Sequence, residues 1–321
     1  MANYTYAVAS IRAMEPSLFS AATLEQLMAC KTQAQCLQFL AEKGWGSPDI
    51  PQTVDAILTC EREKTWKTIE DLQVDLSIFD VLSYQKQFHN LKAAIKEVCT
   101  ESGIHGIFYE DCPLSGEAIM ELLKSKSYED LPASMRDAAK EAHETLLQTG
   151  DGQLCDVIVD RAALEAILSA GQSSDEPIIR DYAESTVAVA DIKIAARSAA
   201  TGKSREFMLR ALAPCESLDC TQLSQAAASG SPALFAYLEG LGYGEAVEAL
   251  RQSPSAFERW CDDRIIETIQ PQLFEAFSVG PLVAYVLARE NEINTVRIIL
   301  SGKQNDLPEA SIRERIRKMY V

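Results

Sequence analysis

The sequence is poor in proline, glycine and basic residues, and each shortage excludes a class of protein. Its 321 residues include only 12 prolines and 15 glycines, too few for a collagen-like or linker-rich chain. A sheet-rich protein would need more turn residues. The 30 lysines and arginines stand against 47 aspartates and glutamates, which gives a net charge of −17. Nucleic acid and anionic lipid surfaces are poor partners for such a chain, because both are bound through basic residues.

Signals for metal ligation, membrane insertion and secretion are also missing. The chain has three histidines, and its nine cysteines form no Cys-x-x-Cys pair, whereas a zinc site needs four ligands at local spacing. We therefore expect no metal site, and reduced thiols that pack as small apolar residues of a cytosolic protein. Polar residues interrupt the longest uncharged run, residues 220–238, and charged residues interrupt the N-terminal segment. We expect neither a membrane span nor a secretory signal.

Apolar residues recur at helical spacing along most of the chain. One such stripe follows a 3-4-3-4-3 rhythm through Val81, Tyr84, Phe88, Leu91, Ile95 and Val98. Residues 178–196 and 282–300 repeat this pattern, and strong helix formers fill the positions between. The sequence therefore predicts an all-α fold.

Capping residues and glycines mark expected helix ends. Capping side chains stand just before proline at Asp49-Ile50-Pro51, Ser231-Pro232, Ser253-Pro254 and Asp306-Leu307-Pro308, an arrangement typical of helix starts. Glycines are expected to stop helices because they adopt left-handed backbone conformations without strain. Those we expect to do so include Gly44, Gly150, Gly171, Gly202, Gly230 and Gly302.

The chain repeats itself at a period of about 100 residues. Residues 90–96 read Asn-Leu-Lys-Ala-Ala-Ile-Lys, residues 191–197 read Asp-Ile-Lys-Ile-Ala-Ala-Arg, and residues 291–297 read Asn-Glu-Ile-Asn-Thr-Val-Arg. This period exceeds that of a solenoid and matches a small helical bundle. We expect one domain over residues 1–321 with three similar bundles, roughly 1–108, 109–214 and 215–321, related by pseudo-threefold symmetry either in a line or round an axis. The alternative is chance similarity among alanine-rich helices.

One position of this repeat carries a cation in all three copies: Lys96, Arg197 and Arg297. In one interpretation, each pairs with a carboxylate of its own bundle and fixes the register of the helices. In the other, the three cations face an axial cavity, or socket, that binds a partner. We favour the first interpretation, since a charge that recurs with a fold usually belongs to the fold.

No pattern in the sequence predicts catalysis. Residues 197–204 end like a phosphate-binding loop, but Arg197 occupies the place of its first glycine and a helix precedes it where a strand is required. A helix end at Gly202 explains the segment better. His-Glu-x-x-His and Gly-x-Ser-x-Gly motifs do not occur. We expect no catalytic and no cofactor-binding residues.

Three segments resemble a known family. They are the opening residues 4–15, Phe88-His89-Asn90-Leu91-Lys92, and residues 288–303, which read Ala-Arg-Glu-Asn-Glu-Ile-Asn-Thr-Val-Arg-Ile-Ile-Leu-Ser-Gly-Lys. With Ile312-Arg313, they resemble the C subunits of the archaeal and bacterial V/A-type rotary ATPases, which are related to the d subunit of the vacuolar proton pump. The resemblance covers essentially the whole chain. Thr295 and Ile194 depart from it, because the family tends to have leucine and asparagine there.

The resemblance implies an all-α funnel of three bundles with pseudo-threefold symmetry. It further implies a non-catalytic central-stalk subunit that binds no nucleotide. Such a subunit lies on the cytoplasmic side of the membrane, between the central-shaft subunits D and F and the membrane proteolipid ring. It couples them during ATP-linked transport of protons or sodium ions.

The C-terminal residues Arg313, Arg315, Arg317 and Lys318 form the densest basic cluster of the chain. One hypothesis is that they contact acidic surface on the ring or the shaft. The other is a solvated helix end stabilised by the helix dipole.

Two other functions compete with the coupling role. One is a soluble all-α scaffold with a different partner. The other is an all-α enzyme with a cleft between bundles, which would need convergent titratable groups.

Overall fold

The computed structural model describes residues 4–100 and 107–321, which form two compact units. The first unit contains the chain up to Leu76, together with Glu176–Ile178 and Tyr243–Val321. The second contains Ser77–Asp175 and Ile179–Gly242. The described residues form helices and no strand, which confirms the predicted all-α class. The three bundles with boundaries near residues 108 and 214 stay a prediction.

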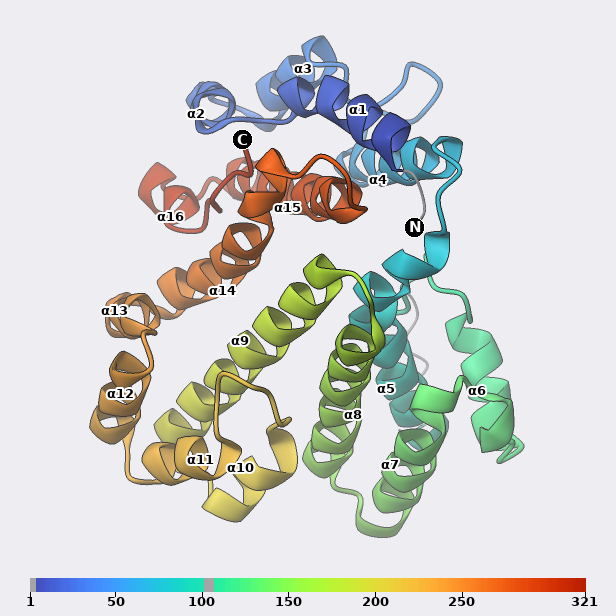
Figure 1. Ribbon diagram of the computed structural model, residues 1–321, viewed down its shortest axis with the longest axis vertical. Coiled ribbons are helices and arrows are strands. Elements are labelled where there is room, and N and C mark those ends of the chain that lie inside the picture. The colour runs from blue at the N-terminus through green and yellow to red at the C-terminus, as the bar shows by residue number, and fades with distance from the viewer. Residues whose placement is uncertain (1–3, 101–106) are drawn as a thin grey trace. The chain divides into compact units, whose positions relative to one another are not determined.

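The first unit is organised around one long helix, α15 (Gly280–Gln304). Most residues of α15 are buried because helices contact it on several sides, as Figure 1 shows. These neighbours are α1 (Thr5–Met14), α3 (Gln33–Glu42), α4 (Val54–Asp71), α14 (Pro254–Ile269) and α16 (Glu309–Arg313). The unit also contains η1 (Glu15–Ser17), α2 (Ala21–Ala29), α13 (Gly244–Gln252) and η5 (Gln270–Phe274).

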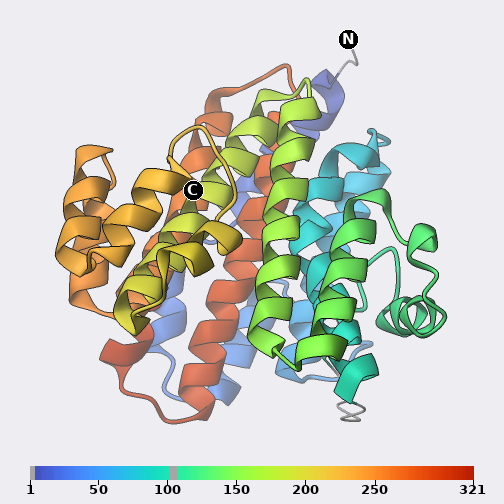
Figure 2. The same ribbon diagram turned by 90° about the horizontal axis from the view of Figure 1, so that it is seen from below.

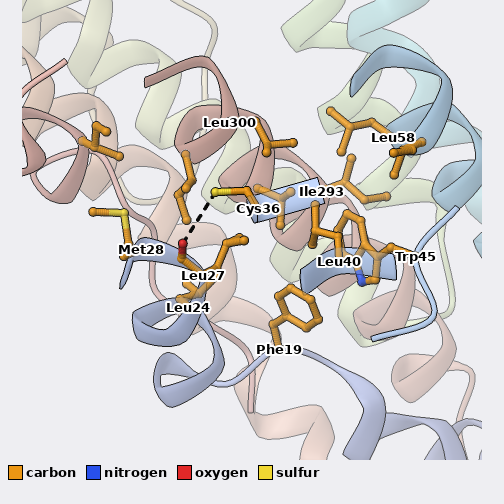
Figure 3. Packing of buried hydrophobic residues seen from close by; sticks show 14 of the residues in the cluster. Phe19, Leu24, Leu27, Met28, Cys36, Leu40, Trp45, Leu58, Ile293 and Leu300 are labelled. Atoms are coloured by element: carbon orange, nitrogen blue, oxygen red, sulfur yellow. Dashed lines mark hydrogen bonds between the residues drawn. The ribbon is translucent and has the colours of Figure 1, made fainter. Parts of the chain in front are cut away.

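The core of the first unit joins residues from both ends of the chain. Figure 3 shows Phe19, Cys36 and Leu40 packed with Ile293 and Leu300 of α15. The rings of Phe19 and Trp45 lie 5.1 Å apart between centroids. Burial of these large apolar side chains supplies the main favourable free energy of the unit. It also fixes the N-terminal helices against α15.

The second unit packs α5 (Tyr84–Thr100) against α6 (Gly116–Lys124), α7 (Arg136–Thr149) and α8 (Gly152–Ser173). Figure 2 shows α7 and α8, in green, as antiparallel neighbours joined by a short turn. Gly150 lies between the two helices in the sequence. The other helices are α9 (Pro177–Thr201), which this unit contains from Ile179 onward, α10 (Arg205–Ala211), α11 (Cys220–Ala228) and α12 (Ser231–Gly240). The 3-10 helices are η2 (Leu76–Ser83), η3 (Tyr128–Asp130) and η4 (Ala133–Met135).

Several predicted helix ends are confirmed. Ser253 caps α14 by accepting a hydrogen bond from the Ala256 amide at 2.9 Å, with Pro254 in the first turn. Gly150 ends α7 in a left-handed conformation, and Gly202 follows α9 with φ of +65°. The apolar positions at helical spacing therefore lie on helices bounded by the expected chemistry.

Three predicted helix ends are wrong, and Ser231 and Asp306 do not cap α12 and α16, which begin after Gly230 and Pro308 without a side-chain cap. The helix expected at Pro51 begins at Val54, because Thr53 rather than Asp49 supplies the capping oxygen. Gly171 and Gly302 lie inside α8 and α15, and the reason is steric. A Cβ atom at Gly171 would come within 2.5 Å of Ala183, and one at Gly302 would come equally close to Ile312. These two glycines permit close packing instead of ending helices.

Candidate functional site

The largest buried charge cluster of the first unit surrounds Arg289 on α15. Its Nη2 donates to Glu61 Oε2 of α4 at 2.6 Å, and its Nη1 donates to Glu292 one turn along α15. Its Nε lies 3.4 Å from Thr65 Oγ1, and the guanidinium lies 5.4 Å from the centroid of the Trp45 ring. Each of the three guanidinium nitrogens therefore has one acceptor, which a buried guanidinium needs.

The two carboxylates of the cluster also bind the backbone of distant segments. Glu61 Oε1 accepts from the Gly46 amide at 2.8 Å and from Lys64 Nζ at 2.7 Å. Glu292 Oε2 accepts from the Phe19 amide at 2.7 Å. Burial raises the pKa of Glu292 to about 7, although the Arg289 charge and the Phe19 amide act in the opposite direction. The cluster thus ties two N-terminal loops to α4 and α15.

This cluster was not found by reasoning from the sequence alone. Carboxylates are abundant in the chain, and Arg289 and Glu61 lie 228 positions apart. The only signal in the sequence was that residues 288–303, which contain both Arg289 and Glu292, carry part of the family resemblance. Because all its members are engaged with one another or with backbone, its arrangement fits a structural role better than proton transfer.

A second recurring feature lies at the first position of the repeated segments, at Asn90, Asp191 and Asn291. Asn90 accepts from the Tyr109 amide and donates to the Tyr109 carbonyl, both at 2.8 Å. Asp191 accepts from the Ala213 amide at 3.1 Å, and Asn291 donates to the Lys318 carbonyl at 2.9 Å. All three side chains are buried. In each case a mid-helix polar side chain holds an irregular segment that lies further along the chain.

The three repeat-equivalent cations lie on α5, α9 and α15. Lys96 Nζ lies 2.6 Å from Asp156 Oδ1 in the second unit, and Arg297 Nη1 lies 3.1 Å from Asp55 Oδ1 in the first. Arg197, in the second unit, is exposed. An axial socket lined by all three cations remains a prediction.

The basic C-terminal residues are mostly neutralised within the first unit. Arg315 is exposed, and its side chain has no ion pair among the described residues. The other three have carboxylate partners: Arg313 pairs with Glu25 and Glu309, Arg317 with Asp262, and Lys318 with Glu267. A role of this segment at an interface stays a proposal.

Two exposed phenylalanines stand on the segment between α14 and α15. Phe274 is 90% exposed and Phe277 is 78% exposed. Arg12 of α1 donates to the Gln272 and Glu275 carbonyls at 2.5 and 2.6 Å, which fixes this segment to α1. The Glu275 carboxylate accepts from the amides of Phe277 and Ala276, and these bonds lower its pKa. These hydrogen bonds order the loop and keep both rings exposed to solvent.

A groove of about 430 Å³ runs along α7 and α8 in the second unit. Its charged lining is mixed and consists of Asp137, Glu141, Arg161, Glu165 and Arg210. The part of the chain that the structure describes contains no group of three histidine, cysteine, aspartate or glutamate side chains that could hold a metal ion. All nine cysteines are free.

No helix among the described residues combines the length and apolarity needed to cross a bilayer.

Comparison with known proteins identifies the family. The family described as ATP synthase (C/AC39) subunit matches residues 7–315. The C subunit of the V-type sodium ATPase of Enterococcus hirae is 23% identical, over 97% of each chain. The C subunit of the A-type ATP synthase of Methanocaldococcus jannaschii is also 23% identical, over 98% of this chain and 86% of its own. That of Halorubrum lacusprofundi is 25% identical, over 98% and 97%. These matches agree with the resemblance noted in residues 4–15 and 288–303, and the chain belongs to the family of C/AC39 subunits of the V/A-type rotary ATPases and ATP synthases.

Proposed function

We propose that this chain is a non-catalytic central-stalk subunit that couples the rotating shaft of a V/A-type ATPase to the membrane proteolipid ring. The observation that carries this proposal is the family match over residues 7–315, with relatives aligned along nearly their whole length. The match therefore spans 86–97% of each of these relatives and is not confined to a single module.

Rigidity supports a coupling role. A body that transmits torque must resist deformation, and close-packed helical interiors have low compressibility. In the first unit, the Arg289 cluster and the apolar core both bind α15 to helices from the N-terminal part of the chain. Buried carboxylates that are bonded to Arg289 and to backbone amides hold segments together and leave little capacity for chemistry.

The exposed face of α1 and the loop with Phe274 and Phe277 is a surface that fits docking. On α1 the exposed residues are Thr5, Tyr6, Ala9 and Ala13, and on the loop they are Pro271, Phe274, Ala276 and Phe277. None of them carries a charge, although the chain has a net charge of −17. Exposed aromatic side chains on an ordered loop are typical of binding surfaces. We assign this surface to the proteolipid ring, since a membrane-embedded assembly is the less polar of the two partners.

Co-purification tests the proposal. The tagged full-length chain is mixed with the shaft subunits D and F and, separately, with the detergent-solubilised ring of the same cell. We expect it to retain both. Binding to the shaft alone would contradict the ring contact. Binding to neither, by a chain whose circular dichroism is helical, would overturn the coupling role and favour a soluble scaffold with another partner.

A further inference from the structure

The carboxyl group of Asp191 is buried in the middle of α9, and one of its two oxygens has no hydrogen-bond partner among the described residues. The residue has no exposed surface. Its Oδ1 accepts from the Ala213 amide at 3.1 Å, and its Oδ2 is buried without a hydrogen-bond partner among the described residues. A buried carboxylate with a single hydrogen bond is costly, because the charge has lost its water and gained little in return.

The charged neighbours of Asp191 are engaged elsewhere. Arg161 of α8 donates to the Leu209 carbonyl and to Glu165, and it forms no ion pair with Asp191. Glu184, two turns earlier on α9, accepts from the Glu216 and Ser217 amides. The remaining titratable neighbours are the thiols of Cys215 and Cys220, and the Asp191 charge contributes to raising the pKa of each thiol. Within the described ranges, no cation therefore neutralises Asp191 by direct contact.

The two repeat-equivalent residues show what this position requires. Asn90 both accepts from and donates to the backbone of Tyr109, and Asn291 donates to the Lys318 carbonyl. An amide is neutral and carries both a donor and an acceptor, whereas a carboxylate only accepts. A protonated carboxyl group has the amide's pattern, with one O–H donor and one carbonyl acceptor.

We propose that Asp191 is a proton-binding site of the second unit, and that its protonation controls how firmly the segment from Leu212 to Leu218 is held on α9. In its protonated form, Asp191 resembles Asn90 and leaves no charge in the core. In its ionised form, it places a second negative charge near Glu184, which holds the same segment. The proposal does not depend on the partners of the subunit.

The titration of Asp191 supports this assignment. Burial raises its pKa to about 7, with a further contribution from Glu184, while the Ala213 amide and Arg161 act in the opposite direction. Opening the segment would expose the group and return its pKa to about 4. The closed form therefore binds the proton more tightly. Its stability is fully present below about pH 4, declines as the pH rises, and reaches its lower level above about pH 7.

Hydrogen exchange of the full-length chain, read by mass spectrometry between pH 5 and 8.5, tests the proposal. After correction for intrinsic exchange rates, protection of peptides covering residues 209–218 should fall by up to about tenfold per pH unit and level off near pH 7. Asp191→Asn should remove this dependence, because an amide supplies the donor without titrating. Asp181→Asn, an exposed position of the same helix, is the matched control and should retain it.

Infrared spectroscopy gives a second readout. Buried carboxylic acids should contribute a C=O stretch that is present at pH 6 and lost by pH 8. Glu292, whose pKa burial also raises to about 7, contributes to the same band, so the band should weaken in Asp191→Asn and keep its full strength in Asp181→Asn. Either of two results would overturn the proposal. One is protection of residues 209–218 that depends on pH equally in the wild type and Asp191→Asn. The other is a C=O band of equal strength in Asp191→Asn and Asp181→Asn.

Discussion

Arg289 and Glu61 are 228 positions apart in the chain, and their side chains meet at 2.6 Å between Nη2 and Oε2. Both are almost completely buried, with 9% and 4% of their side-chain surfaces exposed. Such a pair adds little net stability over an apolar pair of equal volume, but removal of one partner leaves an uncompensated charge. The contact therefore makes the packing of α4 on α15 specific, since a shifted register would leave a buried charge without its partner.

The first prediction concerns the loss of this arginine. Arg289→Met keeps an unbranched apolar stem in place of that of arginine but leaves Glu61 and Glu292 buried without their common cation. We expect the free energy of unfolding to fall by about 3–5 kcal/mol. Denaturant unfolding followed by circular dichroism measures the change.

Arg297→Gln is the control on the same helix. It removes an ion pair with Asp55 in which the side chains are 42% and 86% exposed. Exposed pairs are worth about 0–1 kcal/mol, so this variant should remain close to the wild type. An equal loss in the free energy of unfolding for the two variants would show that the buried cluster contributes no more stability than an exposed ion pair.

Local pattern made much of this fold predictable. The 3-4-3-4-3 stripe through Phe88 and Leu91 and the cap at Ser253 depend on neighbours within a few residues, which the sequence displays directly. The failures at Gly171 and Gly302 have the opposite origin. The position of each glycine inside a helix is explained by a side chain of another helix, Ala183 or Ile312. The neighbouring sequence does not reveal that contact.

The candidate site was harder to predict for the same reason. The repeat drew attention to Lys96, Arg197 and Arg297, at the end of the repeated segment. Its first position, Asn90, Asp191 and Asn291, makes the buried contacts to backbone. A polar residue that recurs among apolar helical positions was a usable signal. Which segment each residue would hold depends on the path of the chain between helices.

The second prediction follows from the contact between α15 and α16. Gly302→Ala places a Cβ atom 2.5 Å from Ile312 Cγ1, although alanine favours helix by up to about 1 kcal/mol over glycine. Overpacking costs about 1–3 kcal/mol, so we expect net destabilisation. Thermal unfolding measures it. Gly240→Ala, at a helical glycine with nothing within 4 Å, should be neutral or slightly stabilising. Stabilisation by both substitutions would mean that α16 is not packed tightly on α15.

The third prediction separates the basic residues of the C-terminal segment. Arg317 pairs with Asp262 at 2.7 Å and is 19% exposed, so Arg317→Gln should lower the free energy of unfolding by about 0.5–1 kcal/mol. Arg315→Gln removes an exposed side chain and should change stability by less than about 0.5 kcal/mol. Denaturant unfolding tests both values. Weaker association of Arg315→Gln with the ring or the shaft at low salt would assign that residue to an interface. Unchanged association would leave the segment with a structural role.

The last prediction tests the aromatic loop of the first unit. Phe274 and Phe277 are 90% and 78% exposed, so Phe274→Ser with Phe277→Ser removes little buried surface from the free subunit. We expect its unfolding midpoint to match that of the wild type. If the rings anchor the subunit on the proteolipid ring, association should weaken at least about thirtyfold, since a single anchoring aromatic residue contributes about 2 kcal/mol or more. Titration of the labelled subunit with solubilised ring measures the dissociation constant.

Leu147→Ser, at a 57% exposed position of α7, is the control variant. It removes an exposed apolar side chain from the second unit and should bind normally. Wild-type affinity of the double variant would exclude the loop from the interface. An equal loss of affinity in Leu147→Ser would point to general surface hydrophobicity, because a specific anchor depends on where the aromatic rings lie.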